Sequence, residues 1–126
     1  LMYKIKNIFL GLFLFLTSFA CAQQDQTSSV SMQEFKDLLK NNKPIVLLDV
    51  RTPEELSGPL GKIDQAINIP IQNLEQRINE LKSYKDKEII VICRTQNRSA
   101  VAVNILKNNG YKVKNVLGGM VLYKQN

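Results

Sequence analysis

Apolar and polar residues alternate along the chain in blocks that have the lengths of strands and helices. Two almost continuous apolar runs, at 45–50 (IVLLDV) and 88–92 (EIIVI), are strand-sized. Continuous runs of this length are typical of strands that are covered on both faces. Shorter segments at 66–70 (AINIP) and 111–117 (YKVKNVL) predict two further strands.

Helix signals occupy the segments between these strands. Ser31 and Glu34 have the spacing of a capping box, in which each side chain bonds to the backbone amide of the other residue. Thr52, Pro53 and Glu55 predict a second helix start, because proline suits the first helical position and the glutamate completes another box.

Two longer helices are predicted, one beginning at Asn73 and one running from Ser99 to Asn108 with Gly110 as its cap. Their apolar residues recur every three or four positions, so each helix should bury one face. The residues expected on these faces are Leu74, Ile78, Leu81, Val101, Ile105 and Leu106. Strands that alternate with helices predict an α/β fold with a central parallel sheet and helices on both faces.

Residues 1–20 differ in kind from the rest of the chain. Two lysines, an apolar stretch and then small or polar residues give them the layout of a secretory signal. Cys21 directly follows a small residue, and we favour a lipoprotein in which this cysteine carries the lipid. The alternative is ordinary signal cleavage that removes Cys21. Residues 21–29 then form a polar tether, and residues 30–126 form one domain.

These features predict a protein of the bacterial cell envelope, on the periplasmic side, with a membrane anchor if Cys21 is lipidated. The chain carries 17 Lys+Arg and 11 Asp+Glu residues, for a net charge of +6. Without residues 1–20 there are 15 basic side chains against 11 acidic ones, or about +4. No basic run interleaved with aromatic residues is present, so we expect no nucleic-acid partner. We expect a monomer.

Cys93 follows a predicted strand and precedes a short polar loop and a helix. The amides of such a loop and the helix N-terminus concentrate positive partial charge, to which Arg94 and Arg98 add full charges. These charges favour the thiolate, which is the reactive form of cysteine. Alternatively, Cys93 is a small core residue and both arginines are solvated or structural, with Arg98 paired to Asp49 or Glu55.

The composition narrows the chemistry further. Histidine is absent, which excludes Ser-His-Asp and Cys-His catalysis and zinc sites built on histidine. Once Cys21 is lipidated or removed, Cys93 is the one remaining thiol, so neither an internal disulfide nor a resolving cysteine is available. We expect no metal ion and no organic cofactor.

Four blocks resemble the rhodanese family, which are sulfurtransferases of α/β fold. LLDVRTPEEL (47–56) and GKIDQAINIP (61–70) are similar to the family's first two signatures. CRTQNRS (93–99) resembles its active-site loop, often written C-R-x-G-x-R-S, and NVLGGMVLY (115–123) resembles its closing segment. Together the blocks cover most of residues 31–123.

The resemblance implies that Cys93 accepts sulfane sulfur as a persulfide, which the amides of the following loop hold. That loop consists of Arg94, Thr95, Gln96, Asn97, Arg98 and Ser99. Asp49 and Arg51 match the family's D-x-R and would line the pocket. Alternatively, Arg51 only pairs with Glu55.

Two features of the loop bear on its chemistry. Gln96 stands where glycine is common in the family, and a positive φ at this position would cost energy. Arg98 is five positions after Cys93, so the spacing in this chain is Cys-x4-Arg. Related phosphatases use Cys-x5-Arg, and Ser99 occupies the position of their arginine. The smaller loop suits a single sulfur atom better than a phosphate group.

The expected reaction is sulfur transfer from a small anionic donor such as thiosulfate to cyanide or an external thiol. A second hypothesis is a non-catalytic rhodanese-like module that binds partners or senses sulfur in the cell envelope. A phosphatase, the third hypothesis, is disfavoured by the loop length.

Overall fold

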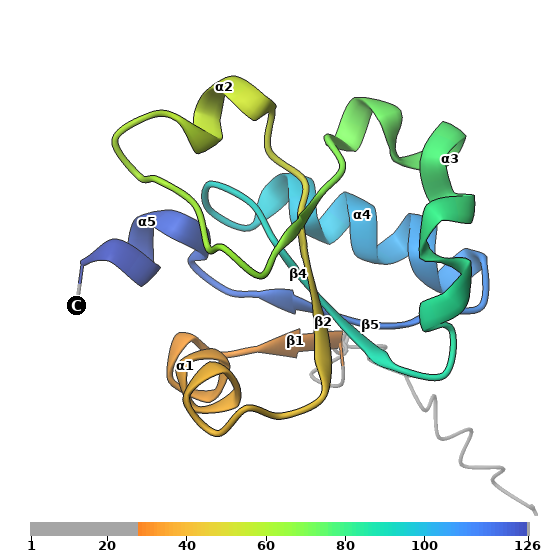
Figure 1. Ribbon diagram of the computed structural model, residues 1–126, viewed down its shortest axis with the longest axis horizontal. Coiled ribbons are helices and arrows are strands. Elements are labelled where there is room, and N and C mark those ends of the chain that lie inside the picture. Colours follow the sequence, from red (N-terminus) through yellow and green to blue (C-terminus); the bar gives the residue numbers. More distant parts are fainter. Residues whose placement is uncertain (1–27, 126) are drawn as a thin grey trace, which may run out of the picture.

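The computed structural model describes residues 28–125, whose strands form one parallel sheet (Figure 1). The strand order is β1-β5-β4-β2-β3. The strands are β1 (Ser29–Val30), β2 (Ile45–Asp49), β3 (Ile67–Asn68), β4 (Glu88–Ile92) and β5 (Lys112–Val116). The predictions of a signal over residues 1–20, of lipidation at Cys21 and of most of the tether fall outside the described residues.

The two long apolar runs form the centre of the sheet, as predicted. β2 and β4 pair in parallel along their whole length, with Leu48 opposite Val91 and Asp49 opposite Ile92. β5 continues the sheet on the other side of β4, with Val91 opposite Asn115. The carboxyl ends of β2, β4 and β5 therefore meet at one edge, where α/β folds place their sites.

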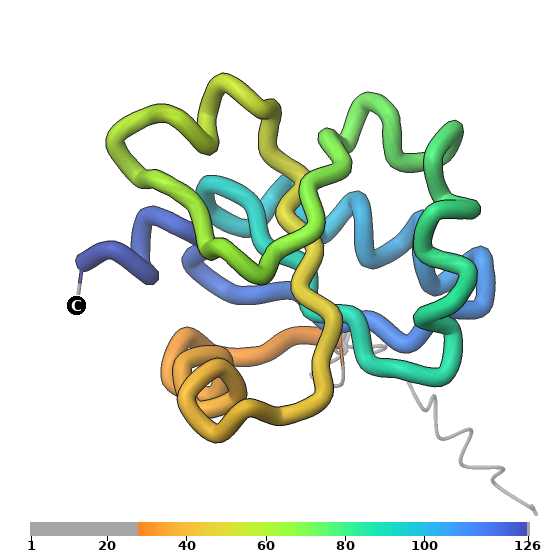
Figure 2. The backbone as a smooth tube through the Cα atoms, in the orientation of Figure 1, coloured from red at the N-terminus to blue at the C-terminus, as the bar shows by residue number. Residues whose placement is uncertain are grey.

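Helices cover both faces of the sheet, which explains why the central strands are continuously apolar. The helical elements are α1 (Met32–Lys40), α2 (Pro53–Leu56), η2 (Ile71–Asn73), α3 (Leu74–Arg77), η3 (Ile78–Tyr84), α4 (Asn97–Asn108) and α5 (Gly119–Lys124). Figure 2 shows α1 and α5 together at one side, and Phe35 of α1 packs against Tyr123 of α5 with ring centroids 5.9 Å apart.

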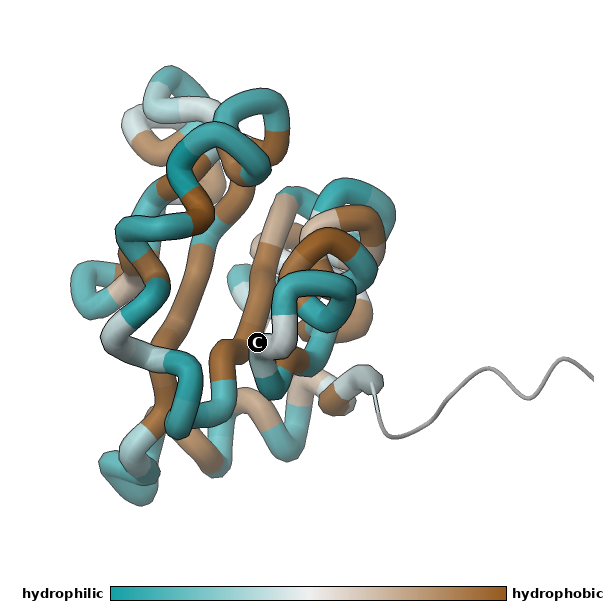
Figure 3. Tube along the Cα trace, turned by 90° about the vertical axis from the view of Figure 1, so that its right-hand side faces the viewer, coloured by the Kyte–Doolittle hydropathy of each residue, from teal (hydrophilic) through white to brown (hydrophobic). Residues whose placement is uncertain are grey.

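Successive residues of β4 divide the core between these faces. Ile89 and Val91 belong to a cluster with Leu106 of α4, whereas Ile90 and Ile92 belong to a second cluster below α1 and α5. Figure 3 shows the hydrophobic stretches running through the middle of the molecule, with hydrophilic segments outside. The alternation follows from the two-residue period of a strand.

Both predicted capping boxes are formed. Ser31 Oγ accepts a hydrogen bond from Glu34 N, and the Glu34 carboxylate accepts one from Ser31 N at 2.7 Å. Thr52 and Glu55 make the corresponding pair of bonds at the start of α2. These bonds satisfy amides that the first turn of a helix leaves without partners.

The helix predicted from Asn73 is wrong in type for most of its length. Only Leu74–Arg77 is α-helical, and residues 78–84 wind as a 3-10 helix. Ile78, Leu81 and Tyr84 recur every three residues, which is the period of a 3-10 helix, and all three pack on the same cluster. The spacing of three was the signal that an α-helical reading overlooked.

The helix predicted from Ser99 begins two residues earlier, at Asn97, and Gly110 ends it with φ +83° as predicted. Val101, which was expected to face inward, is 52% exposed, so this expectation is wrong. The buried face instead consists of Ser99, Ala102, Val103 and Leu106. A polar residue thus occupies the inward position that the apolar pattern missed.

Two elements were not predicted from the sequence. β1 includes Ser29, which had been assigned to the tether, and pairs in parallel with β5 at the edge of the sheet. α5 begins at Gly119, directly after Gly118, in a segment for which no helix was predicted. Within residues 28–125, no helix combines the length and apolarity needed to cross a membrane.

Candidate active site around Cys93

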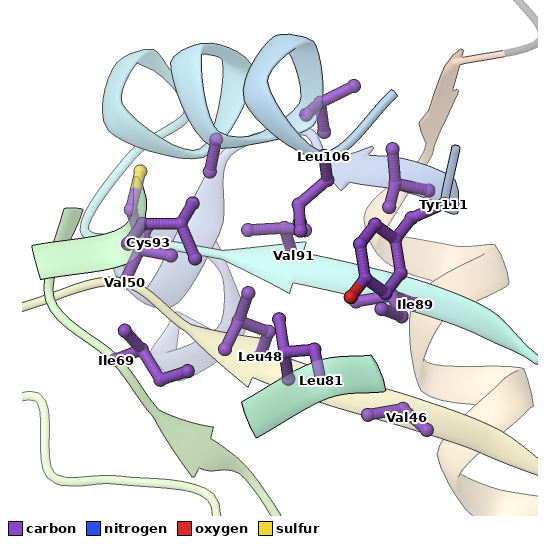
Figure 4. Close-up of a cluster of buried hydrophobic side chains, with 14 residues drawn as sticks. Val46, Leu48, Val50, Ile69, Leu81, Ile89, Val91, Cys93, Leu106 and Tyr111 are labelled. Carbon is purple, nitrogen blue, oxygen red and sulfur yellow. The ribbon is translucent and has the colours of Figure 1, made fainter. Parts of the chain in front are cut away.

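Cys93 lies directly after β4, at the carboxyl edge of the sheet, and its residue is 1% exposed. It belongs to the hydrophobic cluster under α4, and Figure 4 shows its sulfur pointing toward that helix. It is a free thiol. Burial alone would fit a core cysteine, so the polar groups around the sulfur decide what it can do.

One polar side chain contacts the sulfur directly. Ser99 Oγ, in the first turn of α4, lies 3.1 Å from Cys93 Sγ, and the serine is fully buried. The same hydroxyl lies 2.5 Å from Asn115 Oδ1 of β5. Ser99 was predicted as a loop residue, whereas Asn115 was not predicted as part of the site.

The loop after Cys93 is bound to the N-terminus of α5. Met120 N donates to Cys93 O at 2.9 Å, and Val121 N donates to Arg94 O at 3.0 Å. The C=O and N–H of one peptide unit point in opposite directions, so the following amides, of Arg94 and Thr95, point away from α5. Cys93 packs on the opposite face of the sheet from α5, so these amides and the sulfur share one side of the loop.

The amides on that side have no protein acceptor. Among the described residues, no backbone or side-chain oxygen accepts a hydrogen bond from the backbone N–H groups of residues 94–98. Successive free amides next to a helix N-terminus form a concave site for an anionic group. The loop therefore has the donors that a negatively charged sulfur next to Cys93 would need.

Gln96 does not adopt the left-handed conformation that favours glycine. Its φ is −162°, so the positive φ that would require glycine at this position is absent. Its side-chain Oε1 accepts a hydrogen bond from Gly118 N at 3.2 Å. The backbone cost that a positive φ would have imposed is therefore absent.

Arg98 forms an ion pair with Glu55, one of the two carboxylates proposed for it. The two guanidinium nitrogens lie 2.7 Å from the two carboxylate oxygens. These hydrogen bonds hold the pKa of Glu55 at about 2 and raise the pKa of Arg98. Arg98 thus connects the N-terminus of α4 to α2, while its charge still interacts with Cys93.

Arg94 differs from Arg98 in being exposed at the surface. Within residues 28–125 no carboxylate forms an ion pair with it. Its positive charge is available to an anion that approaches the loop from solvent.

Asp49 and Arg51, which were predicted to line the pocket, form a buried ion pair with each other. Each is 1% exposed, and Arg51 Nη2 lies 2.7 Å from Asp49 Oδ2. Arg51 also donates to the carbonyl oxygen of Gly61 at 2.9 Å. The alternative pairing of Arg51 with Glu55 is wrong, because the nearer carboxylate of the same strand end neutralises it.

Two residues of the site were missed from the sequence. Asn115 could have been suspected, because β5 places it two residues after the buried Val113 and hence on the same face as that apolar residue. Gly119, with φ +55°, lies against the loop so closely that a Cβ there would be 2.2 Å from Thr95 O. No local pattern reveals that second contact, because it joins segments that are distant in sequence.

Residues 31–126 match the sequence model of the rhodanese-like domain. The chain belongs to the rhodanese-like domain family. This rhodanese-like domain is 31% identical over 99 residues to the putative sulfurtransferase YtwF of Bacillus subtilis, covering 79% of this chain and 92% of that one. It is 33% identical over 114 residues to the adenylyltransferase and sulfurtransferase MOCS3 of Arabidopsis thaliana, but spans only 24% of that protein.

Solved structures agree with the fold. The rhodanese-like domain protein of Staphylococcus aureus is 33% identical, with a TM-score of 0.69 over 76% of this chain and 90% of that one. The predicted parallel sheet with helices is therefore confirmed. Relatives named as sulfurtransferases support sulfur transfer at the level of the family.

Proposed function

We propose that this rhodanese-like domain moves sulfane sulfur from a small anionic donor, such as thiosulfate, to a thiol through a persulfide on Cys93. The observation that carries the proposal is the run of free backbone amides at residues 94–98, of which those of Arg94 and Thr95 lie on the same side of the loop as the sulfur. A persulfide places negative charge on its outer sulfur, and such amides stabilise negative charge at low reorganisation cost.

The first half-reaction begins with the Cys93 thiolate. It attacks the outer sulfur of thiosulfate, so that a new bond forms to Sγ while the bond between the two sulfur atoms of thiosulfate breaks. Sulfite leaves with that electron pair. Atoms and electrons balance without a further reactant, as in other covalent catalysis by an activated thiol.

The second half-reaction returns the thiolate. An acceptor thiolate attacks the outer sulfur, the bond between the two sulfur atoms on Cys93 breaks, and its electron pair returns to Sγ. Cys93 is the one cysteine of the described residues, and with Cys21 lipidated or removed the acceptor thiol would come from another molecule. In an exported protein that partner would be a thiol of the cell envelope.

The arginines have different roles in this scheme. Arg94 is exposed, and its charge attracts the anionic donor. Arg98 is bound to Glu55 and keeps the loop attached to α2. The site therefore combines one cation that can meet the substrate with one that maintains the geometry.

Burial of the thiol favours a second candidate function. Because Cys93 is 1% exposed, its burial restricts the access of a donor to the sulfur, which the sulfur-transfer reaction requires. A rhodanese-like module that binds a partner or senses sulfur would need no such access, and it makes a different prediction for sulfur loading.

Mass spectrometry after thiosulfate treatment, together with sulfur transfer to cyanide, tests these alternatives. We expect a mass increase of one sulfur atom on the peptide that contains Cys93, and loss of both signals in Cys93→Ser. Cys21→Ser is the matched control and should retain both. Sulfur transfer by Cys93→Ser would contradict the proposed reaction, whereas a wild-type protein that forms no adduct would favour the binding module.

A further inference from the structure

The hydrogen bonds behind Cys93 continue beyond Ser99 and have a defined direction. Asn115 Nδ2 or Oδ1 must face the carbonyl oxygen of Gln96, and a carbonyl oxygen only accepts. The atom 3.1 Å from Gln96 O is therefore the amide nitrogen, Nδ2, which donates. This fixes the orientation of the Asn115 side chain and leaves its oxygen facing Ser99.

The orientation of Asn115 in turn determines where the Ser99 proton lies. Asn115 Oδ1 can only accept, and it lies 2.5 Å from Ser99 Oγ, so the serine hydroxyl donates to it. A hydroxyl carries one proton, so it cannot at the same time donate to Cys93. In this arrangement the Cys93 thiol donates to Ser99 Oγ across 3.1 Å.

The chain of donors therefore runs from the Cys93 thiol through Ser99 and Asn115 to the Gln96 carbonyl. A thiolate at Cys93 has no proton to donate and needs a donor instead, which Ser99 becomes when its hydroxyl rotates away from Asn115. Asn115 Oδ1 at 2.5 Å, Gln96 O at 3.2 Å and the Cys93 thiolate thus compete for one proton, and Asn115 Oδ1 is the nearer of the two oxygens. The asparagine remains anchored through Nδ2 during the rotation.

We propose that Asn115 is a positioning residue, which acts through the hydroxyl of Ser99 to set the balance between the thiol and the thiolate of Cys93. This inference rests on the proposed function for its purpose, since both half-reactions use the thiolate. It concerns the free thiol, however, and can be measured without any sulfur donor. Asn115 touches neither the substrate nor the sulfur in this scheme.

The charged groups around Cys93 stay constant when Asn115 is changed. Arg98 interacts electrostatically with Cys93 and is paired with Glu55, and Asp49 is paired with Arg51. The first turn of α5 contains no acidic residue, and the basic residue of that helix is in its last turn. Replacing Asn115 therefore changes the hydrogen bonds of Ser99 without changing a charge.

The test is the pH dependence of Cys93 alkylation by iodoacetamide in the full chain, followed by mass spectrometry of the Cys93 peptide. Asn115→Leu removes the nearer of the two competing acceptors and keeps the number of side-chain heavy atoms. Gln96 O stays 3.2 Å from Ser99 Oγ and keeps the bond from Ala100 N at 3.0 Å. The midpoint of the profile should move down by roughly half a pH unit to one unit, the equivalent of one hydrogen bond. Ser99→Ala should move it up, because the thiolate loses its donor.

The double variant separates positioning from a general structural effect. In the Ser99→Ala background, Asn115→Leu should leave the midpoint unchanged, because the residue through which it acts is missing. Asn104→Leu, an amide-to-leucine change at an exposed position of α4, is the control and should not move the midpoint. Asn115→Val, which suits a strand, replaces Asn115→Leu if thermal unfolding shows that the leucine variant does not fold.

An unchanged or raised midpoint in a folded Asn115 variant would overturn the proposal, as would an equal downward shift with and without Ser99. If the alkylation midpoint of the Asn115 variant shifts down as expected but the wild-type protein takes up no sulfur on Cys93, the role of Asn115 is supported and the proposed sulfur transfer is contradicted. The two hypotheses therefore fail on different measurements.

Discussion

Gly119→Ala should damage the cysteine loop more than any comparable change in a glycine of positive φ. A Cβ at Gly119 would lie 2.2 Å from Thr95 O and 2.6 Å from the carbonyl oxygens of Arg94 and Cys93. All three neighbours are backbone atoms, so no side chain can move aside. Either α5 or the loop must shift.

The expected cost follows from two contributions. An L-residue at φ +55° costs about 1 kcal/mol or more, and the shift breaks the hydrogen bonds that Met120 N and Val121 N donate to the loop. At about 1 kcal/mol for each bond, the free energy of unfolding should fall by about 3–4 kcal/mol. Displaced carbonyls also turn the amides of the same peptide units, so sulfur loading of Cys93 should fall as well.

Gly110→Ala is the matched control. Gly110 has φ +83°, but its nearest neighbour would be the flexible Lys85 Nζ at 3.8 Å, so only the conformational cost of about 1–2 kcal/mol applies. Urea unfolding measures both variants, and persulfide formation on Cys93 is compared at matched folded fractions. Equal destabilisation of the two variants, with unimpaired sulfur loading in Gly119→Ala, would refute this account of the loop.

Two ion pairs give further predictions. The pKa of Glu55 is held at about 2 by Arg98, so its stabilisation is present above the ordinary value of 4.5 and is lost as the pH falls toward 2. Glu55→Gln should therefore cost about 1–2 kcal/mol at neutral pH, and this cost should shrink toward zero as the pH falls through 2, as measured by urea unfolding across pH. A pH-independent difference would show that the ion pair is not responsible. Asp49→Ala leaves Arg51 buried without its partner and should cost about 3–5 kcal/mol in urea unfolding. A loss below about 1 kcal/mol would mean that water or another group compensates Arg51.

Features that depend on residues close together in the sequence were predicted correctly. The continuous apolar runs identified the two central strands, because a strand that is covered on both faces has no reason to alternate. The capping boxes that begin at Ser31 and Thr52 could be predicted because the two residues of each box lie within one helical turn. The position of Cys93 between a buried strand and a helix start was equally local, and so was its role as the candidate nucleophile.

The elements that were misread depended on weak local signals. β1 has two residues, too few to show a period, and it exists because the edge of β5 provides backbone partners. Residues 78–84 form a 3-10 helix because a spacing of three residues fits the hydrophobic cluster beneath them. Val101 is exposed because the face of α4 that contains Ser99 is the buried one.

The partners of the site residues were decided by the tertiary structure. Arg98 and Glu55 are 43 positions apart, and Ser99 and Asn115 are 16 apart. From the sequence, either Asp49 or Glu55 could pair with Arg98. Arg98 pairs with Glu55 because α2 lies beside the start of α4. The sequence alone determined the buried strands, the position of the candidate nucleophile Cys93 and the length of the loop after it, since each depends on neighbours along the chain. The hydrogen bonds, ion pairs and close glycine contact around that loop exist only because parallel strands bring distant segments to one edge of the sheet.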